Sequence, residues 1–257
     1  MDRSTIVVLQ HSPRDPLGAL TPPLEKATRL VTVRGYEDLA AARALVDDLI
    51  AHQAYAGVIA LGGPMGVYDR HAVPHLQLSM DVIADALRRG APFLGLCLGS
   101  QLLAEVLGSP VFPGARRSLA PEVGFLPLSL TDAGRKDPVM RLFDSGEPVM
   151  LWHEDTHDLP RNAVLLASSA TYAVEAFRVG DRTYGLQFHP EATPETIATW
   201  VEEDRHRLAE LGLAANAVVG EARRYREAIS RRAQNLGRLF VGWVHEFHSG
   251  RRSTLPR

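Results

Sequence analysis

The chain has one cysteine, Cys97, in the stretch "FLGLCLGSQLLAEVLG", where an apolar run typical of a buried strand gives way to a helical pattern. Gly95 and Gly99 stand two residues to either side of it. This spacing is typical of a nucleophile elbow, a sharp strand-to-helix turn that exposes the side chain while the helix N-terminus favours the thiolate. The alternative is a buried, inert thiol, which needs neither glycine. The pattern therefore favours a cysteine nucleophile.

A cysteine nucleophile needs a base, and the base needs an acceptor that orients it. The segment "YGLQFHPEATPE" supplies His189 and Glu191 at the end of another strand-like run. Alternate side chains of an extended segment project to the same side, so His189 and Glu191 can face one site, and Pro190 between them stiffens the backbone. We predict that His189 is the general base and acid and that Glu191 orients it.

An acyl-transfer site also needs hydrogen-bond donors for the oxyanion. The backbone N–H of Leu98, directly after the nucleophile, is the natural first donor. The loop "LGGPMGVYD" can offer a second from Gly63, because glycine permits close backbone approach. A phosphate-binding loop is the rival interpretation, but the loop lacks the Gly-Lys-Ser/Thr ending and the dinucleotide-binding spacing.

Residues 153–157, "HEDTH", match the H-E-x-x-H spelling of a zinc-protease helix. On a helix, His153 and His157 would share one face and Glu154 would serve a zinc-bound water. The segment follows the strand-like "PVMLW" and is soon ended by "DLP", which leaves no room for a long helix. We therefore expect no zinc here, and the sequence predicts no other metal site.

Apolar, β-branched runs with helical segments between them predict a parallel sheet in an α/β domain; they are "STIVVLQ", "RLVTVR", "AGVIAL" and "APFLGL". Helices are expected at "DLAAARALVDDLIAH", with Asp38 as its N-cap, and at "PHLQLSMDVIADALRRG", ended by Gly90. After about residue 121, shorter runs separated by turn residues indicate a partly antiparallel extension.

The C-terminal part is predicted to be helical from Thr193, a capping hydroxyl that precedes Pro194 at the first helical position. Its last segment carries an apolar stripe that we expect to pack on the sheet, with a partner interface as the alternative. The stripe comprises Leu236, Leu239, Phe240, Trp243, Val244 and Phe247. The arginines of "RRAQ" and of "SGRRSTLPR" are expected to form a solvated face and a frayed tail.

Length and composition bound the class of protein. The 257 residues suffice for one large domain, or for one domain with a smaller appendage. A 46% hydrophobic share, a 23% charged share and a formal net charge of −2 are ordinary for a globular protein and give no reason to expect nucleic acid or an anionic membrane as a partner. Neither a signal peptide nor a membrane-spanning run is evident, so we expect a cytoplasmic protein.

The motifs "GGPMG", "GLCLGSQ" and "FHPE", in that order, resemble those of class I (triad) glutamine amidotransferases, specifically the stand-alone proteins similar to the amidotransferase domain of GMP synthetase. The resemblance covers roughly residues 5 to 200. It implies a flavodoxin-like α/β fold, a three-layer sandwich with a mostly parallel central sheet and a small antiparallel extension. We expect residues 1–200 to form this domain and residues 201–257 to form a C-terminal helical extension packed on it.

The resemblance implies a triad of Cys97, His189 and Glu191, with Gly63 and Leu98 as the oxyanion donors. It adds a contact between the glutamine substrate and Gln101, the glutamine of "GLCLGSQ".

In the resembling proteins a W-H-x-D segment forms a wall of the glutamine pocket. This similarity places His153 and Asp155 near the α-amino and carboxylate groups of the substrate. The alternative is that Asp155 and His157 are loop residues that cap one another.

The reaction implied is hydrolysis of the glutamine side-chain amide through a γ-glutamyl thioester on Cys97, giving glutamate and ammonia without a metal or an organic cofactor. The chain shows no second nucleotide-binding pattern, so a separate synthetase subunit is the expected ammonia acceptor. Two alternatives stay open. One is a γ-glutamyl peptidase acting on γ-glutamyl amides, and the other is a non-enzymatic binding or regulatory module on the same fold.

Overall fold

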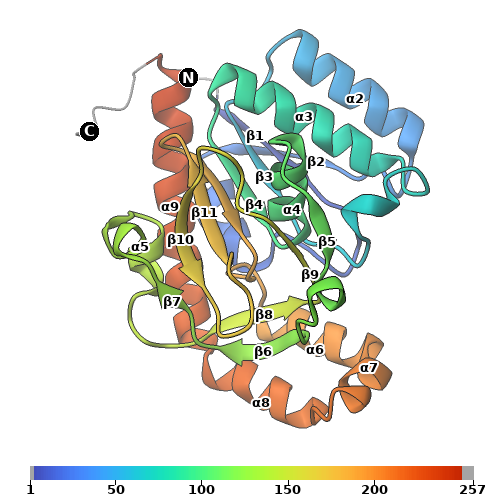
Figure 1. Ribbon diagram of the computed structural model, residues 1–257. Helices are drawn as coiled ribbons and strands as arrows, with labels where there is room; N and C mark the ends of the chain where they lie inside the picture. Colours follow the sequence, from blue (N-terminus) through green and yellow to red (C-terminus); the bar gives the residue numbers. More distant parts are fainter. Residues whose placement is uncertain (1–2, 251–257) are drawn as a thin grey trace.

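A computed structural model describes residues 3–250 (Figure 1), so most of the arginine-containing tail lies outside the described residues. The strands are β1 Thr5–Leu9, β2 Arg29–Val33, β3 Gly57–Ala60, β4 Phe93–Leu96, β5 Val111–Pro113, β6 Glu122–Leu126, β7 Ser129–Leu130, β8 Val149–His153, β9 Asp155–His157, β10 Val164–Ser168, β11 Ala176–Val179 and β12 Thr183–Leu186. The α-helices are α1 Thr21–Glu25, α2 Leu39–Ala51, α3 His75–Arg89, α4 Leu98–Val106, α5 Asp132–Lys136, α6 Pro194–Glu203, α7 Arg205–Glu210, α8 Ala215–Arg224 and α9 Arg226–His248. Short 3-10 helices are η1 Gly18–Leu20, η2 Val67–Asp69, η3 Gly114–Arg117 and η4 Met140–Phe143.

The central sheet has eight strands in the order β2-β1-β3-β4-β12-β11-β10-β7. Strands β2 to β12 of this order run parallel, whereas β11, β10 and β7 continue the sheet with antiparallel pairing. The parallel part has the 2-1-3-4-5 order of flavodoxin-like folds. Two further antiparallel pairs, β5 with β9 and β6 with β8, stand beside it. The α/β fold with a small antiparallel extension is therefore as predicted.

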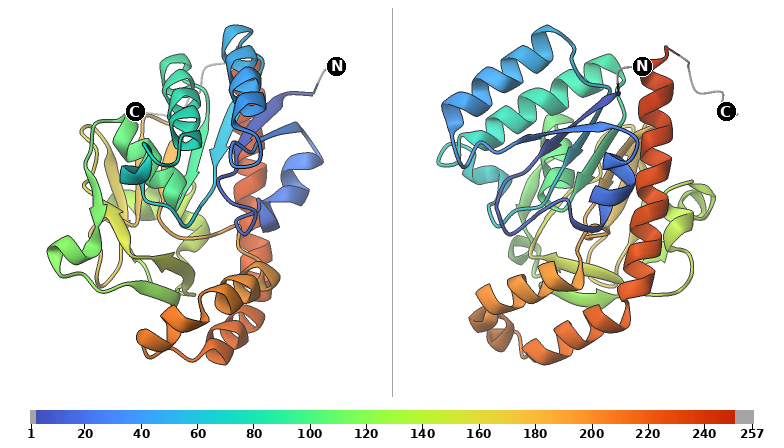
Figure 2. Two further views of the ribbon diagram at one scale, coloured as in Figure 1. Left: turned by 90° about the vertical axis from the view of Figure 1, so that its right-hand side faces the viewer. Right: turned by 180° about the vertical axis from the view of Figure 1, so that it is seen from behind.

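Both faces of the sheet are covered, which gives three layers (Figures 1 and 2). Alternate residues of β1 point to opposite faces. Ile6 and Val8 join the core formed with α1 and α9, whereas Val7 and Leu9 join the core formed with α2, α3 and α4. Burial on both faces explains why the parallel strands are continuous apolar runs.

The predicted helix ends are confirmed. The Asp38 side chain accepts a hydrogen bond from the Ala41 N–H at the start of α2. Gly90 ends α3 at φ 69°, in the left-handed region that glycine favours. At the start of α6, the hydroxyl of Thr193, the residue before Pro194, accepts a hydrogen bond from the Thr196 N–H.

The C-terminal apolar stripe packs on the sheet as predicted, because Phe240 and Trp243 of α9 are buried and Trp243 stacks on Tyr184 of β12 with ring centroids 5.4 Å apart. The expectation that both arginines of "RRAQ" lie on a solvated face is wrong for Arg232, which is 5% exposed. Its guanidinium donates to the carbonyl oxygens of Glu147 and Pro148, acceptors that the helical periodicity of the sequence does not reveal.

The strand register gathers the ends of three strands at one edge of the sheet. Leu96 of β4 pairs with Leu186 of β12, and Gly95 pairs with Ala60 of β3. Residues that follow these strand ends therefore meet at the carboxyl edge, where ligands bind in open α/β sheets. Helices α6, α7 and α8 lie over the same end of the molecule (Figure 2).

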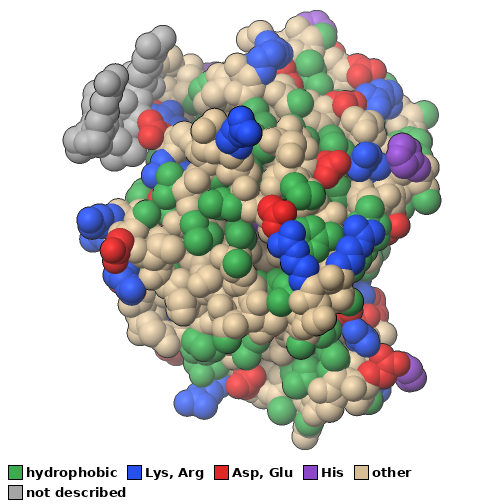
Figure 3. All heavy atoms as spheres, in the orientation of Figure 1, with side chains coloured by type: hydrophobic (Ala, Val, Ile, Leu, Met, Phe, Trp, Pro, Cys, Tyr) green, Lys and Arg blue, Asp and Glu red, His purple; other side chains and the backbone are tan. Residues whose placement is uncertain are grey.

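Basic and acidic side chains are interspersed over the face shown in Figure 3. Among residues 3–250, none of the helices combines the length and the apolar character that a membrane crossing requires.

Candidate functional site

Cys97 lies at the turn between β4 and α4 with φ 49° and ψ −107°, a backbone conformation that non-glycine residues rarely adopt. The flanking glycines make this turn possible. A Cβ on Gly95 would lie 2.5 Å from the carbonyl oxygen of Gly99, and one on Gly99 would lie 2.1 Å from the carbonyl oxygen of Ala60. Strain of this kind at a residue with a reactive side chain points to a functional site.

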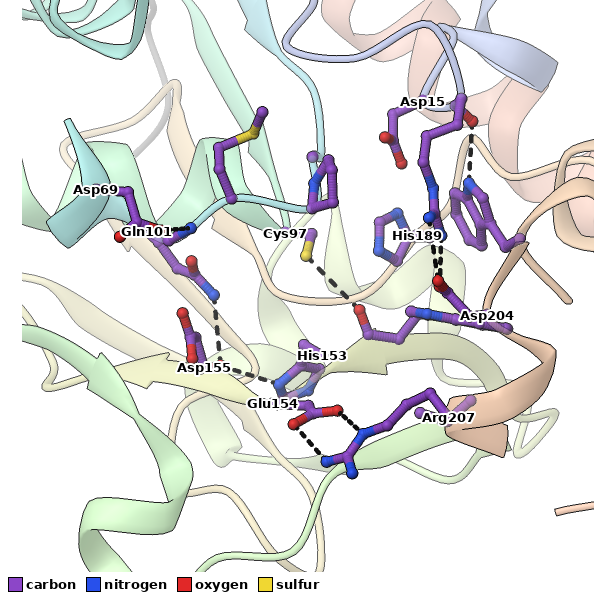
Figure 4. A pocket seen from close by; sticks show the side chains of 18 of the residues that line it. Asp15, Asp69, Cys97, Gln101, His153, Glu154, Asp155, His189, Asp204 and Arg207 are labelled. Carbon is purple, nitrogen blue, oxygen red and sulfur yellow. Dashed lines mark hydrogen bonds and ion pairs between the residues drawn. The ribbon is translucent and has the colours of Figure 1, made fainter. Parts of the chain in front are cut away.

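His189 lies beside Cys97 at the same edge of the sheet (Figure 4). Its Nδ1 is 2.8 Å from Oε1 of Glu191, and both side chains are 3% exposed. Because a carboxylate accepts, Nδ1 carries the hydrogen and donates it. The ring of Trp200 packs edge-on against the His189 imidazole, with ring centroids 4.7 Å apart, and so restricts its movement.

The charge of the site is set by Cys97, His189 and Glu191 together. Burial by itself would lower the pKa of His189, but the Glu191 carboxylate and the Cys97 thiolate outweigh it and hold that pKa well above its ordinary value of 6.5. The arrangement favours the imidazolium form of His189. An ionised thiol is the nucleophilic form of cysteine.

The loop after β3 passes next to the nucleophile. A Cβ on Gly62 would lie 3.8 Å from the Cβ of Cys97 and 3.0 Å from Cε1 of His189. One on Gly63 would lie 2.9 Å from Cδ2 of Leu98, so Gly63 and Leu98 are neighbours in space.

His11, at the end of β1, holds this loop, and nothing in the sequence pattern singled it out. Its Nδ1 donates to the carbonyl oxygens of Leu61 (3.1 Å) and Gly62 (3.3 Å), while Nε2 accepts from the Ser79 hydroxyl at 3.0 Å. Burial, assisted by the neighbouring His75, lowers the pKa of His11 to about 4, so the ring is neutral near pH 7.

Gln101 lies on α4 one turn after Cys97 and lines the cavity. Its Nε2 donates to Oε1 of Gln187 (3.2 Å) and to the carbonyl oxygen of Asp155 (3.3 Å). Gln187 in turn donates from Nε2 to Sγ of Cys97 at 3.5 Å. Gln187 lies directly after β12 and directly before the "FHPE" motif, and it was not predicted as a site residue.

The segment "HEDTH" forms no helix, as predicted, and instead provides the end of β8 and the whole of β9. His153 and Asp155 line the cavity, whereas His157 turns toward Ser100, with Nε2 3.4 Å from its hydroxyl. The alternative that Asp155 and His157 cap one another as loop residues is wrong, because β9 pairs with β5. Glu154 points to the rim, where it forms an ion pair with Arg207.

A cavity of about 400 Å³ opens beside Cys97, within the range of small-molecule sites. Its lining includes Arg14, Asp15, Met65, Trp152, Leu208 and Leu211. Two ion pairs cross its rim, Arg14 with Asp204 at 2.6 Å and Arg207 with Glu154 at 2.6 Å (Figure 4). Burial raises the pKa of Asp15 to about 6 against the opposing charges of His189 and Arg14.

Comparison with known proteins places the chain in a family. Residues 24–205 match the family model described as glutamine amidotransferase class-I. The glutamine amidotransferase-like protein YfeJ of Salmonella typhimurium is 30% identical over 162 residues, which cover 60% of this chain and 64% of that protein. The glutamine-hydrolysing GMP synthase of Thermomicrobium roseum is 36% identical over 143 residues, 55% of this chain and 24% of that protein.

The match thus spans less than two thirds of the YfeJ protein and about a quarter of that GMP synthase. Among solved structures, a glutamine amidotransferase from Thermotoga maritima superposes with a TM-score of 0.78 at 26% identity, over 94% of this chain and 99% of that one. A glutamine amido transferase from Methylobacillus flagellatus shares the fold with a TM-score of 0.77 at 20% identity, over 95% of this chain and 96% of that one.

Proposed function

The chain belongs to the class-I glutamine amidotransferase family, and we propose on this basis that it hydrolyses the side-chain amide of glutamine through a γ-glutamyl thioester on Cys97. The observation that carries the proposal is the strained Cys97 elbow beside a histidine whose Nδ1 lies 2.8 Å from Glu191. A nucleophile, a base and an orienting carboxylate in one place are what acyl transfer requires.

In the first half of the reaction the Cys97 thiolate attacks the carbonyl carbon of the substrate's side-chain amide. The backbone N–H groups of Gly63 and Leu98 donate to the oxyanion that forms. His189, held protonated by its neighbours, gives its Nε2 proton to the departing nitrogen, so the C–N bond breaks and ammonia leaves. The γ-glutamyl group stays on Sγ as a thioester.

In the second half, His189 is neutral and takes a proton from a water molecule, which attacks the thioester carbon. The C–S bond breaks, glutamate leaves and the thiolate returns. Glu191 keeps the imidazole oriented and stabilises its cationic form in both halves. No step calls for a metal or an organic cofactor.

Three further residues are proposed to bind the substrate. Gln101, His153 and Asp155 line the cavity next to Cys97. The Gln101 amide is positioned by Gln187 and by the backbone of Asp155, so its orientation is fixed before substrate arrives. We assign Gln101 to the glutamine itself, and His153 and Asp155 to the α-amino and carboxylate end of the substrate.

A γ-glutamyl peptidase is the second candidate, and the outer wall of the cavity favours it. Arg207, Leu208 and Leu211 line the cavity but follow residue 205, where the family match ends. This part of the wall therefore comes from α7, at the start of the proposed C-terminal extension, residues 201–257. Extra wall next to the nucleophile offers contacts to a leaving group larger than ammonia.

An ammonia-accepting synthetase subunit is the proposed partner if glutamine is the substrate. The relatives named GMP synthase are glutamine-hydrolysing and far longer than the matched segment. Ammonia released at Cys97 would then pass to that subunit.

The test is mass spectrometry of the full chain incubated with glutamine and with a panel of γ-glutamyl amides. We expect glutamate as a product and a trapped γ-glutamyl adduct on Cys97, together with covalent labelling of Cys97 by a glutamine-analogue electrophile. In the Cys97→Ala variant the adduct, the labelling and the turnover should all disappear. Undiminished hydrolysis by Cys97→Ala contradicts the thioester mechanism.

A further inference from the structure

Three buried ionisable side chains converge behind the wall of the cavity: Glu122 of β6, His153 of β8 and Glu175, the residue before β11. Nε2 of His153 is 3.3 Å from Oε1 of Glu175 and 3.8 Å from Oε2 of Glu122. The side chains of Glu122, His153 and Glu175 are 6%, 1% and 0% exposed. The cluster is therefore shut off from water.

The hydrogen bonding of His153 leaves its Nε2, an acceptor in the neutral ring, facing the acceptor oxygens of two carboxylates. Its Nδ1 lies 3.1 Å from the carbonyl oxygen of Asp155, and because a carbonyl only accepts, Nδ1 carries the hydrogen. In the neutral ring Nε2 then bears a lone pair, directed at the two carboxylates. Within residues 3–250, no hydrogen bond of suitable geometry reaches Nε2, Oε2 of Glu122 or either carboxylate oxygen of Glu175.

Lone pairs cannot be left facing one another in a dry interior without a large cost, so a positive charge must lie between them. Two carboxylates and a neutral imidazole carry two negative charges. A divalent cation neutralises both charges at once, whereas neutralising them without an ion takes two protons, one on the ring and one on a carboxylate.

The donor set fits a first-row divalent ion. One imidazole nitrogen and two carboxylate oxygens are ligands of the kind that bind Zn²⁺ at about 2.0–2.2 Å, and ligands at the corners of such a tetrahedron lie roughly 3.4 Å apart. The 3.3 Å and 3.8 Å separations are close to this spacing. The Nδ1–H bond to a backbone carbonyl is the outer-shell contact that commonly orients a metal-binding histidine.

We propose that Glu122, His153 and Glu175 form a binding site for a divalent transition-metal ion, with Zn²⁺ as the probe ion. This site differs from the zinc-protease site that the H-E-x-x-H spelling would predict, because it uses His153 but neither Glu154 nor His157. It goes beyond the proposed hydrolysis and does not depend on it. With both ring nitrogens of His153 committed behind the wall, the substrate contact proposed above for His153 falls to its backbone.

The position of the site indicates a structural role for the ion. Glu122 and His153 are register partners across the β6–β8 pair. The carbonyl oxygen of Glu175 accepts a hydrogen bond from the Gln187 N–H at 2.8 Å, two residues before His189. An ion held by all three side chains would fasten the β6–β8 wall of the cavity to the strand that leads to the triad.

The experiment uses the full chain, stripped with a chelator and titrated with Zn²⁺ alone by calorimetry, with the metal content measured after gel filtration. We expect one equivalent per chain and a rise in the midpoint of thermal unfolding, because an ion that binds only the folded state stabilises it. Glu175→Gln keeps the size of the side chain and removes one ligand charge, so Zn²⁺ affinity should fall at least tenfold. Co²⁺ in place of Zn²⁺ should give ligand-field absorption bands that Glu175→Gln loses.

His206→Asn is the matched control. His206 and Glu210 form an exposed i,i+4 pair on α7 that can collect zinc adventitiously, and its removal should leave the stoichiometric binding unchanged. Glu122→Gln tests the second carboxylate and keeps the proposal falsifiable if circular dichroism shows that Glu175→Gln does not fold. Equal binding by wild type and a folded Glu→Gln variant overturns the proposal, because the ion is then held elsewhere. Absence of Zn²⁺ and Co²⁺ uptake by the wild type overturns it too, because protons then occupy the cluster.

Discussion

At the scale of single residues, Cys97 joins a reactive side chain to an unfavourable backbone. Its φ of 49° is unfavourable for a residue with a Cβ, whereas glycine adopts such a φ without this free-energy cost. We predict that Cys97→Gly and Cys97→Ala both lose turnover, by on the order of 10⁴-fold or more. Cys97→Gly should nevertheless be the more stable variant by about 1 kcal/mol, since Cys97→Ala keeps the strain. Denaturant unfolding of the two variants measures the difference, and equal stability would contradict the claim that the backbone at residue 97 is strained.

Asp15 is a carboxyl whose burial works against the fold. It is 7% exposed, and one of its oxygens, Oδ2, finds no hydrogen-bond partner within residues 3–250. The rise of its pKa from 3.8 to about 6 is led by desolvation and corresponds to about 3 kcal/mol. Because the folded state favours the protonated acid, this penalty is absent below pH 4, grows through pH 6 and is complete above it.

We therefore predict that Asp15→Asn raises the free energy of unfolding at pH 8, by up to ~3 kcal/mol, and leaves it nearly unchanged at pH 4. Urea unfolding across this pH range makes the measurement. Asp181→Asn, at an exposed carboxyl, is the control and should give no such pH-dependent difference. A gain at pH 8 that persists undiminished at pH 4 would contradict desolvation as the cause.

At the scale of elements, the proposed oxyanion site depends on the position of the loop after β3 relative to the start of α4. Its carbonyl groups are held by His11, and a Cβ on Gly63 would lie 2.7 Å from Sδ of Met65 and 2.9 Å from Cδ2 of Leu98. The Sδ and Cδ2 atoms are side-chain ends that can move aside, but the Cβ of His11, 3.1 Å from the added methyl group, can move only with its backbone. We predict that Gly63→Ala shifts the loop and lowers kcat by up to about 10²-fold to 10³-fold, the cost of one oxyanion donor, with little change in KM.

Gly220→Ala is the control for an added methyl group. Gly220 lies inside α8, where a Cβ would meet nothing within 4 Å, so the substitution should leave kcat unchanged and stabilise the helix by about 1 kcal/mol. Steady-state kinetics and thermal unfolding of the two variants separate the effect on the loop from a general effect on folding. Full activity in Gly63→Ala would exclude a role for this backbone.

The elements also explain how much the sequence alone could predict. Cys97 and His189 were found because each follows an apolar run, and parallel strands bring such positions to one edge. His11 and Gln187 were missed because their roles depend on which strands are neighbours, which no local pattern states. Glu175 illustrates the limit most clearly, since it meets His153 only through the pairing of three separate segments.

At the scale of the whole molecule, the cavity is completed by α7, the helix that begins where the family match ends. Arg207 and Leu211 line it, and the Arg207 guanidinium donates to both oxygens of Glu154 at 2.6 Å and 2.7 Å across the rim. Exposed ion pairs of this kind contribute little to stability, so the rim can rearrange around a leaving group at low cost. A wall of this kind is useful for a substrate that extends beyond glutamine.

We predict that the isolated chain hydrolyses glutamine slowly and γ-glutamyl dipeptides with a kcat/KM at least tenfold higher. Arg207→Ala should raise KM severalfold for a dipeptide and leave the glutamine kinetics nearly unchanged, because only the longer substrate reaches the rim. Arg205→Ala, at an exposed residue of α7 that pairs with Glu202 instead, should change the kinetics of neither substrate.

Fractionated cell extract supplies the opposing test: if a fraction accelerates glutamine hydrolysis and not dipeptide hydrolysis, the chain is an ammonia-supplying subunit and the rim is a docking surface. Fast glutamine hydrolysis that neither extract nor Arg207→Ala alters would contradict both roles and indicate a dedicated glutaminase.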